Sequence, residues 1–181
     1  MEPALKNIQR TSRNIFIGSF LLVGFFIIAV KFNVFQSRLM EGEPLPEIIS
    51  NQWLTAPLSM DDTEGKVILL FFAKGDVEIS REMLSWSYKL QKKYHLSGLV
   101  TLAIEVPASD EQRKKYGSIN FSDTPDGFYA FADIDNTERK KFRHASYATF
   151  YVADRLGTIR AVRDAAKGFD AMEHVVAELL K

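Results

Sequence analysis

Cysteine is absent from the 181 residues of the chain. Redox chemistry by cysteine is therefore excluded, although a protein without disulfides can reside on either side of a membrane. The chain also lacks net charge, because 23 lysine and arginine residues balance 23 aspartate and glutamate residues. No overall field would draw it to a phosphate backbone, so we expect no nucleic-acid binding.

Metal ligands are also few. The three histidines, His95, His144 and His174, are scattered and none forms a pair with ligand spacing. Acidic Asp133, Asp135 and Asp154 could meet near strand ends, but an Asp-x-Asp before a helix is more typical of a cap and a turn. We therefore expect neither a metal nor another cofactor.

Hydrophobic residues make up 46% of the chain, which is enough for one well-buried domain with an appendage. The appendage is Asn14 to Phe35. Its first part, Asn14 to Val30, carries no charge, and the stretch reaches membrane-spanning length if Lys31 snorkels. We predict a single transmembrane anchor at 14–35 that contacts the lipid bilayer, preceded by a cytoplasmic segment at 1–13.

The alternative for this stretch is a cleaved signal peptide, because Lys6, Arg10 and Arg13 form a basic leader. No small-x-small cleavage site follows the apolar run, which favours the anchor. The same basic residues favour a cytoplasmic N-terminus. The prediction is a single-pass protein of the inner (cytoplasmic) membrane whose folded domain, at 45–181, faces the periplasm or the cell exterior, with a polar linker at 36–44.

The apolar run Val67 to Ala73 predicts a strand buried on both faces. A helix follows, with apolar residues at spacings of three and four that can pack on this strand. They are Met83, Trp86, Leu90 and Tyr94. The alternation of strand and helix continues, which implies parallel pairing in an α/β fold.

The remaining elements are predicted from capping, turn and periodicity signals. They are a strand at Gly98 to Val106, a capped helix at Ser109 to Tyr116, a strand at Phe128 to Ala132, a basic helix at Thr137 to Arg143, a hairpin of Ser146 to Asp154 with Thr158 to Val162, and a C-terminal amphipathic helix from about Phe169 to Leu180.

Three motifs occur in a fixed order along the chain. The first is Gly42-x-Pro44-Leu45-Pro46 with Glu64-Gly65-Lys66-Val67, the second is Phe71-Phe72-Ala73 with Arg81-Glu82-Met83, and the third is Thr149-Phe150 with Asp154 and Gly157-x-Ile159. Together they resemble the membrane-anchored thioredoxin-like proteins of the TlpA-like group. The resemblance implies a thioredoxin-like fold, a central mixed β-sheet flanked by helices, over Leu45 to Lys181.

The redox centre of that family does not survive in this chain. By the resemblance, the two catalytic cysteines fall on Asp76 and Ile79, the preceding tryptophan on Gly75, and the buried acid of thioredoxins proper on Leu70. The family's cis-proline falls on Ala148. A cis bond before a non-proline residue costs about 3 to 4 kcal/mol, so we expect a trans bond there.

The resemblance therefore implies a retained fold whose former active site has lost its chemistry. The candidate binding residues on this surface are Gly75, Asp76, Val77, Glu78, Ile79 and Ala148, which would form a peptide-binding groove without covalent capture. For the acids Asp76 and Glu78 the simplest interpretation is a helix N-cap and a solvated side chain.

The charged run Glu138-Arg139-Lys140-Lys141 with Arg143 is expected to be a solvated helix face. Its alternative is a docking patch for an acidic partner.

Three functions remain open after these exclusions. The first is a redox-inactive accessory or structural subunit, or an assembly factor, of a membrane protein complex. The second is a non-redox enzyme in which Asp76, Glu78 and a histidine such as His144 act as acid and base. The third is a peptide-holding chaperone of the periplasm that binds exported proteins.

Overall fold

The computed structural model describes residues 39–50, 52–106, 109, 119–143 and 146–181. The predicted anchor at 14–35 and the predicted helix at 110–116 lie outside these residues. Within the described ranges, no helix is both long enough and apolar enough to cross a membrane. Residues Arg38–Lys181 form one compact unit.

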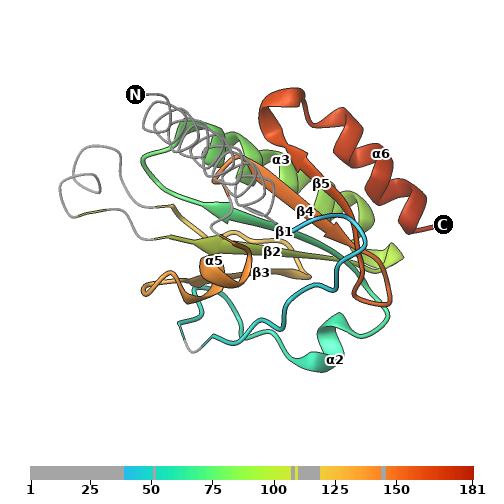
Figure 1. Cartoon of the computed structure of the whole chain (residues 1–181), viewed down its shortest axis with the longest axis horizontal. Coiled ribbons are helices and arrows are strands. Elements are labelled where there is room, and N and C mark those ends of the chain that lie inside the picture. Colours follow the sequence, from blue (N-terminus) through green and yellow to red (C-terminus); the bar gives the residue numbers. More distant parts are fainter. Residues whose placement is uncertain (1–38, 51, 107–108, 110–118, 144–145) are drawn as a thin grey trace, which may run out of the picture. The chain divides into compact units, whose positions relative to one another are not determined.

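A mixed sheet of five strands forms the centre of this unit (Figure 1). The strands are β1 (Val67–Ala73), β2 (Leu99–Glu105), β3 (Phe128–Ala132), β4 (Thr149–Ala153) and β5 (Ile159–Asp164), in the order β3-β2-β1-β4-β5. The first three are parallel, β4 is antiparallel to β1, and β5 is antiparallel to β4. The predicted strands and their parallel pairing are confirmed.

Strand β1 is buried on both faces, as its continuous apolar run predicts, because all seven of its residues are withdrawn from solvent. Alternate side chains point to opposite faces of a sheet. Leu69 and Phe71 therefore join one hydrophobic core, and Leu70 and Phe72 join another on the far side. The sheet must be covered on both faces.

Two helices cover the first face, α3 (Glu78–Tyr94) and α6 (Asp170–Leu179) (Figure 1). The helix predicted after β1 buries Met83 and Leu90 on the sheet, while Trp86 stacks on Phe169 at 5.2 Å between ring centroids. The C-terminal helix buries Met172. Both helical faces were predicted from their spacing and are confirmed. Two short 3₁₀ helices, η1 (His95–Ser97) and η2 (Ala165–Lys167), follow α3 and β5, and Ala165 of η2 belongs to the same core.

The second face is covered by α5 (Thr137–Lys141) and by residues 39–50 and 52–58, which we call the strap. The strap pairs with both edges of the sheet. At β5, the Gly42 amide donates to the Ile159 carbonyl over 2.8 Å, and at β3 the Leu54 amide donates to the Ala130 carbonyl over 2.8 Å. A short helix, α2 (Met60–Thr63), then leads into β1. Main-chain groups of the two outer strands, β5 and β3, are hydrogen-bonded in this way without an additional strand.

The strap changes the predicted domain boundary. Leu39 is only 6% exposed, and the Glu43 carbonyl accepts from the Ile159 amide over 2.9 Å. The folded unit therefore begins no later than Leu39, inside the segment predicted as a linker at 36–44. A polar, proline-containing segment has the composition of a linker, and its pairing with a strand far along the chain leaves no local signal.

One buried polar side chain joins α3 to the sheet. Gln91 is fully buried, its Nε2 donates to the carbonyls of Leu99 and Asp126 at 2.9 Å each, and its Oε1 accepts from the Thr101 hydroxyl at 2.8 Å. Gly127 leaves room for this amide, because a Cβ at that residue would lie 2.5 Å from Gln91 Nε2.

Replacing Gln91 by leucine should lower the free energy of unfolding by about 3 kcal/mol, because two carbonyls and one hydroxyl lose their buried partner. Urea unfolding of the full-length protein in detergent, followed by circular dichroism, measures this change. The neighbouring exposed Lys92→Ala is the control and should stay within about 0.5 kcal/mol of wild type. Equal stability of the two variants would contradict the structural role of Gln91.

Candidate functional site

The predicted groove residues meet at the end of the sheet where β1 finishes and β4 starts. Because β4 runs antiparallel to β1, Phe71 lies opposite Phe150, and the loop after β1 lies beside the segment before β4. Ser80 links the two segments: its hydroxyl accepts from the Lys74 amide at 3.2 Å and donates to the Tyr147 carbonyl at 3.3 Å. The structure thus brings the start of α3 next to the segment that contains Ala148.

Asp76 is an ion-paired side chain rather than a helix cap. Its side chain is only 10% exposed, and its Oδ2 lies 3.2 Å from Lys74 Nζ. The N-cap of α3 is Val77, whose side chain makes no capping bond. The prediction that Asp76 is the helix N-cap is therefore wrong, because the N-cap is Val77 and the Asp76 carboxylate binds the Lys74 ammonium. Glu78 is exposed, as expected for a solvated acid.

The neighbouring loop residues are also held in place. The Gly75 carbonyl accepts from Arg81 Nη2 at 2.8 Å. Ile79, at the position of the second cysteine in the resemblance, is half-buried and packs against the core shared with α3 and α6. Val77 is half-buried. The loop is therefore held by apolar packing, by an ion pair and by a hydrogen bond to its backbone.

Ala148 lies across from this loop, and its main-chain groups already have internal partners. No cis peptide bond occurs among the described residues, so the expected trans bond before Ala148 is confirmed. Its amide donates to Ser146 Oγ at 3.2 Å, and its carbonyl accepts from the Ala165 amide at 2.6 Å. An added strand would have to break these bonds, so a peptide in this groove would be recognised by side chains instead.

An aromatic corner adjoins the groove. The Tyr147 ring has Lys74 Nζ 5.8 Å from its centroid and the Arg139 guanidinium 4.8 Å from it. Such cation–π contacts hold flexible side chains over the ring. Tyr147 was missed by sequence reasoning, although its place directly before Ala148 was an available signal. The approach of Arg139 to the Tyr147 ring depends on where α5 lies.

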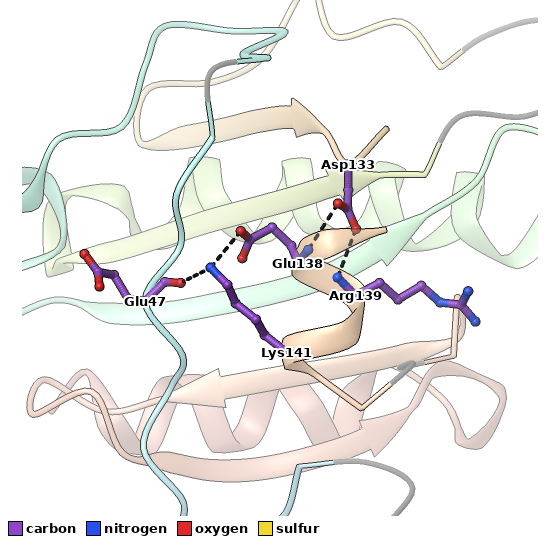
Figure 2. Close-up of polar contacts among 5 residues, drawn as sticks. All are labelled: Glu47, Asp133, Glu138, Arg139 and Lys141. Atoms are coloured by element: carbon purple, nitrogen blue, oxygen red, sulfur yellow. Dashed lines mark hydrogen bonds and ion pairs between the residues drawn. The ribbon is translucent and has the colours of Figure 1, made fainter. Parts of the chain in front are cut away.

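Asp133, directly after β3, makes the capping contact predicted for the Asp-x-Asp pair, although the N-cap position itself is Asn136, whose side chain makes no capping bond. Asp133, which is 4% exposed, accepts from the Glu138 amide at 3.1 Å and from the Arg139 amide at 2.9 Å (Figure 2). Asp154 follows β4, which runs antiparallel to β1 and β3. It therefore lies at the opposite end of the strands and does not meet Asp133. In the described ranges, no group of three or more His, Asp or Glu residues could hold a metal ion.

The charged run of α5 differs from its prediction. Glu138 is buried, and its Oε1 accepts from Lys141 Nζ at 2.8 Å, while the same Nζ donates to the Glu47 carbonyl at 2.9 Å (Figure 2). Arg143 binds the Glu43 carboxylate at 2.7 Å. The expectation of a solvated face is therefore wrong for Glu138, because the strap lies against this side of the helix.

The residues of the alternative acid/base site have separate environments. Asp76 is bound by Lys74 and Glu78 is exposed, while His144 lies outside the described residues. His95 and His174 are both exposed. The described residues therefore do not supply a histidine partner for Asp76.

No protein-family model and no curated protein sequence matches the chain. Solved structures do match it. A Chlorobium tepidum protein described as a thiol:disulfide interchange protein, DsbE, has a TM-score of 0.62 and 21% identity, covering 79% of this chain and 99% of its own. The thioredoxin domain of a thiol-disulfide oxidoreductase from Bacteroides vulgatus has a TM-score of 0.58 and 17% identity, covering 76% and 99%. A thiol-disulfide isomerase from Corynebacterium glutamicum has a TM-score of 0.57 and 18% identity, covering 76% and 96%.

These likenesses define the fold. The described part of the chain has a thioredoxin-like α/β fold with a mixed sheet of five strands, as the sequence motifs predicted. The neighbours are thiol-disulfide oxidoreductases by description, whereas this chain has no cysteine. The comparison therefore gives the architecture alone.

Replacing Lys74 by methionine should destabilise the fold by about 2 kcal/mol, because the Asp76 carboxylate then stays largely buried without its ammonium partner. The double variant Lys74→Met with Asp76→Asn should recover part of this loss, since the charge is gone as well. Urea unfolding of all four combinations gives the coupling free energy. Strictly additive losses would mean that the ion pair contributes nothing.

Proposed function

We propose that the protein is a redox-inactive, membrane-tethered thioredoxin-like protein that serves as an accessory or structural subunit, or an assembly factor, of a membrane protein complex. The predicted span at 14–35 would be the tether, with the folded unit on the periplasmic or outer side. The observation that supports a binding role best is the former active-site loop, where Asp76 is paired with Lys74 and Ile79 packs on the core.

The physical argument rests on what this loop retains. A surface that has lost its thiols but keeps an ion pair, a packed isoleucine and a bonded glycine carbonyl is preorganised, and preorganisation lowers the entropic cost of binding. Val77 and Tyr147 are both half-buried and are the apolar and aromatic groups available there. Because the main-chain groups of Ala148 are already bonded, recognition would use these side chains.

Purification of the full-length protein from its native membrane, through a C-terminal tag in mild detergent, tests this function. Co-purifying proteins are identified and quantified by mass spectrometry. A fixed stoichiometric set of membrane proteins is the expected result. A varied, substoichiometric collection of exported proteins would instead indicate a peptide-holding chaperone, and recovery of the protein alone would contradict both roles.

The groove itself is tested by Val77→Asp, which places a charge among the apolar contacts without opening the core. Retention of the partner should fall at least about tenfold, the effect of losing a central interface contact. Ile79→Asp is less suitable, because Ile79 packs against the core and the variant would also destabilise the fold.

The matched control for this experiment is Leu96→Asp, another change from an apolar residue to aspartate, at a residue that is 91% exposed after the far end of α3. This variant should retain the partner as wild type does. Undiminished retention by Val77→Asp would remove the groove from the proposal while leaving the complex itself in place.

A further inference from the structure

Two leucines project into solvent from neighbouring turns, at the end of the sheet where β1 begins and β4 finishes. Leu96, in η1, is 91% exposed, and Leu156, in the turn between β4 and β5, is 86% exposed. Arg155 ties these turns together, because its guanidinium donates to the Gly65 carbonyl before β1 at 2.9 Å and to the Ser97 carbonyl at 3.5 Å. We call Leu96 and Leu156 the leucine pair.

A single exposed leucine is common on protein surfaces and needs no explanation. The leucine pair differs because its two members come from turns far apart in the sequence that are bonded to each other in the folded unit. Exposed apolar side chains that gather beside cations are typical of surfaces that contact membranes or other proteins.

Two cations lie between the turns that carry the leucine pair. A Cβ on Gly98 would lie 3.4 Å from a guanidinium nitrogen of Arg155 and 3.6 Å from Cδ of Lys66, so both side chains flank this glycine. Arg155 donates to neutral carbonyls, and these bonds leave its charge uncompensated. The base of the leucine pair is therefore positively charged.

The acids at this end of the sheet only partly offset these cations. Asp154 is compensated already, because its Oδ2 accepts from Arg160 Nε at 2.6 Å. Asp126 is exposed and lines the same hollow as Lys92, which offsets its charge. Glu64 is exposed and remains against the two cations between the turns. A positive excess therefore remains beside the leucine pair, which suits a negatively charged surface.

The length of the chain before the folded unit indicates which surface this is. The span predicted at 14–35 ends four residues before Leu39, a distance of about 14 Å at most for an extended chain. Leu39 already belongs to the fold, and six residues later the Leu45 amide donates to the Gly157 carbonyl at 2.8 Å. The start of the strap is thus bonded to the turn that carries Leu156, so the proposed tether would keep this turn near a bilayer.

We propose that the leucine pair contacts the surface of a phospholipid bilayer that contains anionic lipids. Leu96 and Leu156 enter the boundary between headgroups and acyl chains, and Lys66 and Arg155 lie at the lipid phosphates. A bilayer accepts two projecting side chains without preformed pockets, which a protein partner would have to supply. This inference rests on the membrane tether of the proposed function, and it adds a lipid contact made by the folded unit itself.

The test uses the full-length protein in vesicles made of equal parts of phosphatidylcholine and phosphatidylglycerol. Because the chain has no cysteine, Leu156→Cys creates a single site for an NBD fluorophore. Phosphatidylcholine with a doxyl quencher just below its headgroup should quench this label, and the quenched fraction measures docking on the bilayer. The control is the same label at Ile134→Cys, which is 57% exposed after β3 at the opposite end of the strands and should be quenched far less.

Variants of the Leu156-labelled protein separate the apolar contribution from the charge. Leu96→Asp should lower the docking equilibrium constant at least about tenfold, because a leucine leaves the bilayer and a negative charge replaces it. Ile134→Asp is the matched control and should dock as the parent protein does. Lys66→Gln should lower docking about fivefold in the mixed vesicles and much less in phosphatidylcholine alone. Lys140→Gln removes the same charge from an exposed residue of α5 and should have no effect.

Three outcomes would overturn the proposal. They are equal quenching of the labels at residues 134 and 156, undiminished docking of Leu96→Asp, and equal docking of Lys66→Gln and Lys140→Gln. Extraction of the wild-type protein from the vesicles by alkaline carbonate would contradict the tether and this inference together. A protein that resists extraction but shows no quenching at residue 156 would overturn this inference alone. The purification in detergent does not involve a bilayer contact, so it decides the role in a complex separately.

Discussion

Burial of β1 on both faces is the constraint on which the rest of the structure depends. Seven consecutive residues withdrawn from water require a cover on each side of the sheet. Helices α3 and α6 supply one cover, and α5 with the strap supplies the other. The C-terminal end of β1 lies beside the N-terminal end of β4, because the two strands are antiparallel. The loop around Asp76 is therefore next to the segment of Tyr147 and Ala148.

The loop between β1 and α3 is held in place although the chain has no cysteine. The Asp76 carboxylate is ion-paired with the Lys74 ammonium, and Ile79 packs against the core. Val77 and Tyr147 are the half-buried apolar and aromatic side chains beside this loop.

Helix α5, which follows β3, depends on contacts with residues that are distant in the sequence. A helix of five residues such as α5 is too short to be stable alone, so it needs the cap from Asp133 and the contact of Lys141 with the Glu47 carbonyl of the strap. These contacts bury Glu138. Arg139, on the same helix, reaches the Tyr147 ring, so this short helix contacts both the strap and the segment before β4.

The sequence by itself determined the elements whose signals are local: the apolar run of β1, the periodic faces of α3 and α6, the hairpin, and the order of motifs that pointed to a thioredoxin-like fold without its redox pair. Tertiary structure decided the partners of charged side chains. Asp76 was predicted as a cap and is an ion pair, Glu138 was predicted as solvated and is buried, and residues from Leu39 were predicted as a linker and pair with β5. Each depends on segments that meet only in the folded chain, because the free energy of a charged or polar group is set by its neighbours in space.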